Sequence, residues 1–592
     1  MASKSLDRIL SSLEAARYQF GPKEAQRILR MLRALDAARF PDPATLIRFH
    51  EALMFLRAFP HSPTVLRKTE SLLNNFSKRI KAIRESGADM DAFDTFEVSG
   101  IAGTTMEDTL SFDVARWLLH RMPGRVDIAW DNYEPGRELG TTGPRFMPLL
   151  EDDAFVEADT PWRRWLEAAG GSSGKKSGNT GTRIPAWLVE RFENLPLPQP
   201  QKAELYESLR IPLRWKLDNS PISRTRNWKP VPQPFYHQGP LISRSQVSLA
   251  DELARRPPTF TRLSLPEGER IAEMIREVML VRYRELYGTT LADPRSVVRV
   301  ELGSGKDEAD SRGVEIYLWS LPPARRLPLR AYVAGFTLKN GVPINYIEAI
   351  GLCEWMEVGF NTFYTFRGGE AGWIYAQVLR SLCAYMGTTV VSVYPYQLGH
   401  DNDEAIESGA FWFYRKLGFR PGRANLLDLA KREEKRIAAS TGAAAAKKYR
   451  TLARTLRRLA AGHVFYDLPG TEIGAWDRFS TRNIGLRVSQ RMAREFGGDI
   501  ERMRDHTRRA LERNLSIHTS NWKPLDKLAF DNLALALAEA PAPRVWTKKE
   551  KEELVRIIRA KSAPDEMRYL HLTQRHERLR QAILQAGSEC AS

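Results

Sequence analysis

EAIESGAFWFYRKLGFRP, which runs from Glu404 to Pro421, is the most informative stretch of the chain. It predicts one amphipathic helix, because apolar residues recur at helical spacing at Ile406, Ala410, Phe413 and Leu417. Asn402 or Asp403 can cap the start of this helix. Gly418 suits the left-handed residue that ends many helices, and Pro421 prevents continuation.

Length and composition indicate an ordinary multidomain globular protein. At roughly 150 residues per domain, 592 residues correspond to about three or four domains. No run of about 18 apolar residues occurs, so no membrane span is expected. The opening residues, MASKSLDRILSSLEAARYQF, lack the apolar core of a secretion signal. Cys353, Cys383 and Cys590 lie at unrelated spacings, which favours neither a disulfide framework nor a zinc site, and we expect a cytoplasmic location.

The positive charge is unevenly distributed. The net charge is +17, and residues 431–592 hold 33 Lys and Arg against 20 Asp and Glu, a difference of +13. The excess is densest from Lys431 to Gly462. Such a region is typical of proteins that bind an anionic partner such as coenzyme A, RNA, DNA, an acidic protein or a membrane surface. It is equally typical of a solvated helical face, and the sequence leaves both interpretations open.

Periodicity and composition divide the chain into four segments. Residues 1–165 are predicted to form a mainly helical domain, and residues 166–258 a Pro-rich extended region that begins with the Gly/Ser linker Gly170–Arg183. Residues 259–429 alternate between helical and β-rich patterns. Residues 430–592 are predicted to be a basic helical domain, with Thr547-x-x-Glu550 as a capping box.

The segment 259–429 carries the clearest order of elements. A helix is predicted first, then short β-rich runs that include a hairpin turn at Asn340-Gly341. A helix ending at Gly387, a buried strand in TTVVSVYPY and the helix from Glu404 follow. The fold class predicted from this order is α+β, with a mixed sheet that has helices on both faces and is flanked by helical domains.

Two motifs in this segment resemble the GNAT acyltransferase superfamily. The first is A-x-x-F-Y-x-K-L-G-F, from Ala410 to Phe419, which is similar to the last-helix signature of the family. The second is the loop RGGEAG, Arg367–Gly372, which precedes a helix as the family's phosphate-binding loop does. The resemblance covers about residues 263–425. It implies a GNAT-like central sheet and an enzyme that transfers an acyl group, with acetyl expected, from coenzyme A to an amine.

The resemblance also implies a cofactor site. Backbone N–H groups at a helix N-terminus attract anions, so the pyrophosphate of acyl-CoA would be held by Arg367, Gly368, Gly369, Ala371 and Gly372. The pantetheine arm would enter between two parallel strands, near Val358 to Phe360, and bond to the backbone there. Glu370 stands where the family has a glycine, and a carboxylate that points at phosphate would repel it.

Two residues are the candidates for catalysis. Tyr414 occupies the family's general-acid position, where a phenol can protonate the departing thiolate. Its aromatic neighbours also suit a purely structural role in a core. Glu357 is the candidate base on the strand before the loop, with Glu354 and Glu348 as alternatives. Strand alternation places Glu354 and Glu357 on opposite faces.

Three other functions remain open. The fold can serve as a non-catalytic scaffold, or as a nucleic-acid-binding protein that uses the basic C-terminal helices. The chain can also be an enzyme of the same fold that takes an aminoacyl group from charged tRNA. The sequence does not name the acceptor. The acidic run HDNDE, residues 400–404, lacks the spacing of a calcium loop.

Overall fold

The computed structural model describes residues 2–95, 97–133, 162–171, 183–284, 292–303, 311–440, 449–539 and 545–588. The chain separates into two compact units, each with its own interior. The first comprises Met1–Pro240, Glu273–Thr290 and Asn340–Pro343, and the second comprises Leu241–Ala272, Leu291–Lys339 and Ile344–Ser592. Cys590 and most of the predicted linker Gly170–Arg183 lie outside the described residues.

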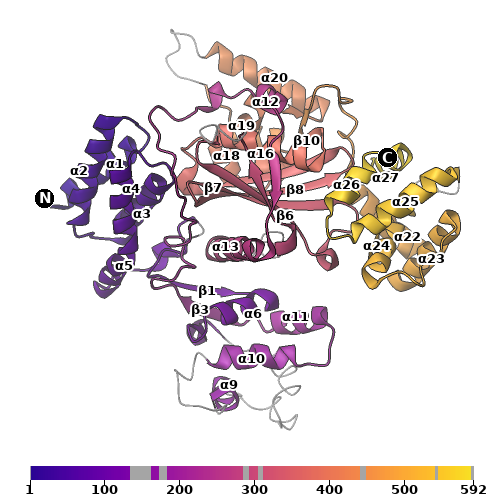
Figure 1. Ribbon diagram of the computed structural model, residues 1–592, viewed down its shortest axis with the longest axis horizontal. Helices are drawn as coiled ribbons and strands as arrows, with labels where there is room; N and C mark the ends of the chain where they lie inside the picture. Colours follow the sequence, from indigo (N-terminus) through magenta and orange to yellow (C-terminus); the bar gives the residue numbers. More distant parts are fainter. Residues whose placement is uncertain are drawn as a thin grey trace. The chain divides into compact units, whose positions relative to one another are not determined.

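The first unit begins with helices, as the periodicity predicted. They are α1 (Ala2–Ala16), α2 (Pro22–Asp36), α3 (Pro43–Ala58), α4 (Pro63–Asn74) and α5 (Phe76–Glu85), drawn in indigo and violet in Figure 1. The prolines mark helix starts, because proline fits the first turn, where its missing N–H is not needed. Asp42 and Ser62 cap α3 and α4 through their side chains.

A small antiparallel sheet follows in the first unit. Its strands are β1 (Thr105–Thr109), β2 (Val126–Ile128) and β3 (Pro212–Lys216), in the order β1-β3-β2. Helices α6 (Phe112–Arg121), α10 (Ile184–Glu193) and α11 (Gln199–Ser208) supply its core partners, with Phe112, Phe192 and Trp215 fully buried. Helix α10 lies in the segment that we expected to be extended, so that expectation was wrong for these residues.

The second unit is built on a nine-stranded mixed sheet of order β11-β12-β10-β9-β8-β7-β6-β5-β4. The strands on the β4 side run antiparallel: β4 (Thr259–Arg262), β5 (Val298–Glu301), β6 (Val314–Ser320), β7 (Ala331–Lys339), β8 (Val342–Leu352) and β9 (Trp355–Thr362). The predicted turn between β7 and β8 is confirmed, because Asn340 and Gly341 have φ of 48° and 77°.

The far side of the sheet contains the single parallel pair among the strand pairings given for the described residues. Strand β10 (Val390–Val393) runs parallel to β9, and β12 (Val464–Asp467) pairs antiparallel with both β10 and β11 (Arg420–Pro421). Helix α16 (Ala371–Met386) connects β9 to β10, and Figure 1 shows α12 (Leu249–Ala254), α16 and α19 (Ala410–Lys416) over the same face of the sheet. The molecule is therefore mixed in helix and strand.

Two expectations about this side of the sheet were wrong. The stretch 404–421 forms two short helices, α18 (Asp403–Ser408) and α19, because Gly409 adopts a left-handed φ of 70° and ends the first. Asn402 does cap the first helix, through its side-chain oxygen and the N–H of Ala405. Strand β12 lies in the segment expected to be helical throughout, so the sheet extends past residue 429.

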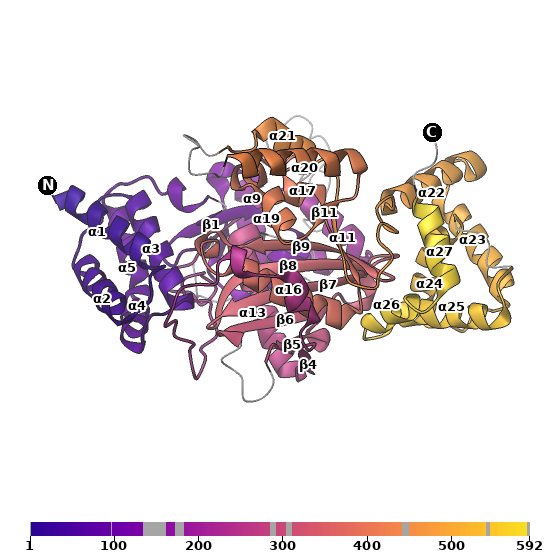
Figure 2. The same ribbon diagram turned by 90° about the horizontal axis from the view of Figure 1, so that it is seen from above.

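The inserted helices between β11 and β12 carry the densest positive charge. They are α20 (Ala424–Ala439) and α21 (Ala453–Leu459), seen together with α19 in Figure 2. The chain continues with α22 (Thr481–Phe496), α23 (Ile500–Leu515), α24 (Pro524–Leu537), α25 (Lys548–Lys561), α26 (Met567–Thr573) and α27 (Glu577–Gly587). The capping box at the start of α25 is confirmed. Within the described ranges, no helix is long and apolar enough to cross a membrane.

Candidate functional site

The pairing between the parallel strands β9 and β10 covers only the first part of β9. Register pairs join Val390 to Trp355, Val391 to Met356 and Ser392 to Glu357, and the pairing ends there. Strand β9 continues to Thr362, whereas β10 ends at Val393 and the chain turns into α17 (Pro395–Leu398). The residues of β9 after Glu357 therefore have no pairing partner on β10.

Glu357 sits at the point of separation and is paired. Its Oε2 lies 3.0 Å from His463 Nε2, and its Oε1 lies 3.6 Å from the guanidinium of Arg330. The imidazole of His463 makes an edge contact with Tyr394 at 5.3 Å, and Arg482 donates a hydrogen bond to the Tyr394 hydroxyl. An imidazole held by a carboxylate can accept a proton from a substrate while the carboxylate fixes its orientation.

The two alternative carboxylates have other partners. Glu354 lies in the turn before β9, where it accepts hydrogen bonds from Trp476 Nε1 and Arg580 Nε, both at 2.7 Å. Glu348 on β8 accepts a hydrogen bond from the Tyr332 hydroxyl, and burial raises the pKa of its carboxyl. Of the three carboxylates, Glu357 is the one that contacts an imidazole, so we retain it as the candidate base.

Val358 and Phe360 occupy β9 just after the separation. Val358 is buried and opposite Ala349, and Phe360 is opposite Ile347, with its ring 4.9 Å from that of Tyr375 on α16. Gly359 between them faces the other side of the sheet. An ideal Cβ placed there would lie 3.8 Å from the Gln397 side-chain nitrogen, so Gln397 brings an amide to this face.

Glu370 at the start of α16 is fully buried, and its charge is balanced. Its carboxylate pairs with Lys339 at 3.2 Å and with Arg312, and it accepts a hydrogen bond from the Ile242 N–H at 3.1 Å. Desolvation is the largest influence on Lys339 and lowers its pKa to about 8, against the opposing effect of Glu370. Paired in this way, Glu370 does not present an uncompensated negative charge to a ligand at the helix N-terminus.

Several other groups of the predicted phosphate loop already bond to residues of the protein. Arg367 forms an ion pair with Glu404 and its Nε donates to the Thr362 carbonyl at 3.2 Å. The N–H of Gly369 donates to the Phe366 carbonyl, which closes a turn. Gly368 lies within this turn, and Ala371 and Gly372 open α16.

Arg244 covers the remaining glycine of that loop. An ideal Cβ on Gly372 would lie 3.0 Å from Arg244 Cγ and 3.3 Å from its Cα. The Arg244 guanidinium donates to the Lys416 carbonyl at the end of α19. The segment around Arg244, which we expected to be an extended connector, therefore crosses the N-terminus of α16 and adds a positive charge there.

Tyr414 lies in an aromatic cluster between α16 and α19. Its ring contacts those of Tyr375, Phe413 and Phe419 at centroid distances of 5.7, 5.3 and 5.7 Å. Burial raises the pKa of the Tyr414 phenol, which keeps its proton in place at neutral pH. The neighbouring Tyr375 hydroxyl is fully buried and has no hydrogen-bond partner among the described residues.

Sequence reasoning missed His463, Arg330, Gln397 and Arg244. His463 is 106 positions from Glu357, so no local pattern connects them. The one usable signal was the β-rich run Val464–Asp467 directly after His463, which was read as part of a helical region. No cluster of three or more His, Cys, Asp or Glu side chains suited to a metal ion occurs within the described residues, which include the run 400–404.

Comparisons with known proteins give no family assignment for this chain. No family model matches the sequence, and no significant match was found among curated proteins or solved structures.

Proposed function

We propose that the protein is an N-acyltransferase that uses acyl-CoA, with acetyl as the preferred acyl group, and an amine as acceptor. The observation that supports this most is the end of the β9–β10 pairing at Glu357, with α16 linking the two strands. A strand end left unpaired beside a helix N-terminus suits a long ligand with an anionic end. The two GNAT-like motifs lie in the loop before α16 and in α19.

The charges at the N-terminus of α16 suit the anionic end of acyl-CoA. Arg244 and Arg367 are both at this end of the helix, and Glu370 is neutralised by Lys339 and Arg312. Since Arg244 lies over Gly372, the phosphates would meet its guanidinium together with the amides of Gly368 and Ala371. Val358 and Phe360 would line the path of the pantetheine arm.

Acyl-CoA supplies the acyl group as a thioester, and transfer forms a C–N bond while the C–S bond breaks. The amine must lose a proton, which the pair Glu357–His463 can accept at the imidazole. The leaving sulfur must gain a proton, which Tyr414 would donate from its phenol. Its raised pKa keeps that proton available, although it also makes the transfer less favourable than from an ordinary phenol.

Isothermal titration with acetyl-CoA tests the proposal directly. We expect saturable binding to the full chain, and release of free thiol when an amine acceptor is added. No binding up to about 1 mM ligand, which is a binding free energy weaker than about 4 kcal/mol, would refute it.

A nucleic-acid-binding scaffold is the second candidate, and one observation favours it. Several cationic side chains on and just before α20 and α21 are exposed and form no ion pair with another described residue: Lys431, Arg432, Lys435, Arg450, Arg454 and Arg458. Fluorescence anisotropy with RNA and DNA over a series of salt concentrations distinguishes this candidate. Binding that weakens steeply with salt, in a protein that does not bind acetyl-CoA, would support the scaffold.

A further inference from the structure

An open groove lies on the second unit, away from the separated strands. Its volume is about 590 Å³, and its walls come from β4, the C-terminal end of α16 and the segment around α26. Volumes of roughly 300–1,000 Å³ are typical of sites for small organic ligands. The groove is therefore large enough for a compact metabolite.

One wall of the groove is aromatic. The rings of Phe260 on β4 and Tyr385 on α16 are 5.1 Å apart at their centroids and inclined by 43°. Both side chains are only partly buried, so their rings reach the groove. A nucleobase stacks on such a surface at a gain of about 1–3 kcal/mol.

The opposite wall is cationic. Arg568, His571 and Arg575 line it at spacings of three and four residues, which places them on one face over about 10 Å of helix and following turn. Arg568 and Arg575 are exposed and form no ion pair with another described residue. Asp565 also lines the groove, but it pairs with Arg262 at 3.5 Å. The wall therefore has a net positive charge suited to phosphate.

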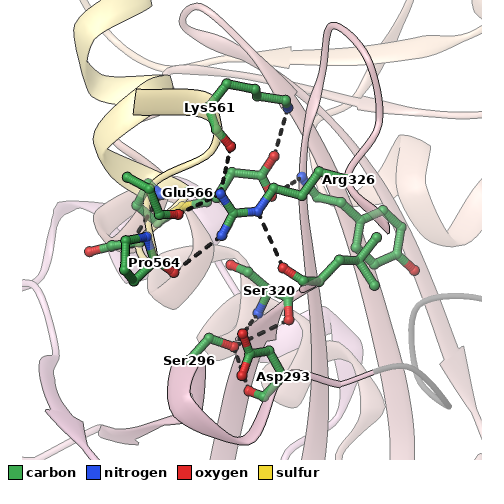
Figure 3. A network of polar contacts seen from close by, with 12 residues as sticks. Asp293, Ser296, Ser320, Arg326, Lys561, Pro564 and Glu566 are labelled. Carbon is green, nitrogen blue, oxygen red and sulfur yellow. Dashed lines mark hydrogen bonds and ion pairs between the residues drawn. The ribbon is translucent and has the colours of Figure 1, made fainter. Parts of the chain in front are cut away.

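The cationic wall is fixed to the sheet. Arg326 donates to the carbonyls of Lys561 and Ala563 at 2.6 Å and to that of Pro564 at 3.2 Å (Figure 3). Lys561 Nζ lies 2.6 Å from Glu566, which is fully buried. Figure 3 shows these groups converging on the turn that precedes α26. The helix that carries Arg568 and His571 is thus held in place before any ligand binds, which reduces the entropic cost of binding.

We propose that this groove binds a nucleoside phosphate, with its base on Phe260 and Tyr385 and its phosphate on Arg568 and Arg575. An aromatic surface facing two arginines suits a ligand that joins a flat ring to an anion. A simple anion would use only the arginines, and an acidic peptide would leave the rings uncovered. The proposal holds whether or not the chain transfers acyl groups, because none of these residues belongs to the separated strands.

Calorimetric titration of the full chain with AMP, and separately with ribose 5-phosphate, tests the proposal. AMP should bind, and ribose 5-phosphate, which lacks the base, should bind at least about 10-fold more weakly. The double variant Arg568→Gln/Arg575→Gln should weaken AMP binding by at least about 10-fold. Tyr385→Ala should reduce AMP affinity to that of ribose 5-phosphate, and Tyr385→Phe should preserve it.

Arg502→Gln is the matched control, because Arg502 is exposed on α23 and does not line the groove. It should leave AMP binding unchanged. The arginine substitutions are on the surface, so they remain informative if Tyr385→Ala does not fold. Absence of AMP binding would overturn the proposal, as would equal affinity for AMP and ribose 5-phosphate. A five-nucleotide single-stranded RNA that binds more than about 10-fold tighter than AMP would overturn the assignment to a free nucleotide and favour a polymer.

Discussion

Glu357 and His463 lie 3.0 Å apart at the point where two parallel strands separate, although 106 positions divide them in the chain. Their elements explain the encounter. Glu357 makes the last pairing between β9 and β10, and His463 directly precedes β12, which pairs with β10 on its other side. The sheet thus brings a carboxylate and an imidazole together at the strand end that we assign to the acyl donor.

Removing either partner should slow acyl transfer. We expect Glu357→Gln or His463→Gln to lower kcat by about 100-fold, which is within the usual contribution of a general base. Since the pair acts as a unit, kcat of the double variant should be at most about threefold lower than kcat of the slower single variant. Steady-state kinetics measures this. His400→Gln, at an exposed histidine, should have wild-type kinetics, and fully additive losses would refute a shared role.

The sequence predicted the strands and helices of this site better than the side chains that meet there. Alternation and helical spacing are local properties, so β9, α16 and β10 could be recognised from residues that are neighbours in the chain. Gly409 was missed as a break, because a single glycine is tolerated in a helical pattern. Strand β12 was missed because its four residues stand in a basic, helix-rich region.

The partners of buried charges could not be predicted from sequence. Glu370 looked like a group that would repel phosphate, but its charge is balanced by Lys339 and Arg312, which are 31 and 58 positions away. Arg244 reaches Gly372 from a segment whose proline content suggested only an extended connector. Such pairings depend on tertiary packing, which periodicity does not record.

Tyr414→Phe should show whether the Tyr414 hydroxyl acts in catalysis or only belongs to the aromatic core. Loss of the proton donor should lower kcat by about 100-fold, while acetyl-CoA affinity in calorimetry stays within about twofold. Tyr375→Phe is the matched control, because its hydroxyl is also buried in the cluster and has no partner in the described ranges. It should keep wild-type turnover, and its stability should rise by about 1 kcal/mol as an unsatisfied hydroxyl is removed. Equal turnover in both variants would exclude Tyr414 as the acid.

Arg244→Ala tests the charge over the start of α16. Because its guanidinium adds positive charge beside Gly372, we expect acetyl-CoA to bind about 10-fold more weakly, with Arg244→Lys intermediate. The affinity from calorimetry is the measurement. Arg255→Ala, at an exposed arginine of the same segment, should not change it. Tighter binding by Arg244→Ala would mean that this side chain obstructs the site.

Glu370→Gln should destabilise the second unit. It leaves the buried Lys339 without its carboxylate, and breaking a buried ion pair by removing one partner costs about 3–5 kcal/mol. Urea unfolding followed by circular dichroism measures the loss. Glu404→Gln is the comparison, because Glu404 is about half exposed where it pairs with Arg367, and its loss should change stability by less than about 1 kcal/mol. Equal effects of the two variants would contradict a structural role for Glu370.

Two buried histidines should make the first unit sensitive to acid. Desolvation lowers the pKa of His50 and of His61 to about 4, and for His50 it outweighs the nearby Glu51. Between pH 6.5 and 4 the unfolded chain therefore binds more protons at these sites than the folded chain. The contribution of these histidines to the free energy of unfolding is complete above pH 6.5. It falls as the pH drops, by up to about 3 kcal/mol for each histidine.

The matched variants His50→Gln and His61→Gln remove one titrating group each. Glutamine keeps a donor and an acceptor for the contacts of His50 with Glu51 and Thr225, and for that of His61 with the Gln19 carbonyl. Urea unfolding of the full chain at pH 7 and pH 4.5 should show a smaller loss on acidification in each variant than in the wild type. An unchanged loss in both variants would place the acid sensitivity elsewhere, because only the substituted imidazole has been removed from the proton balance.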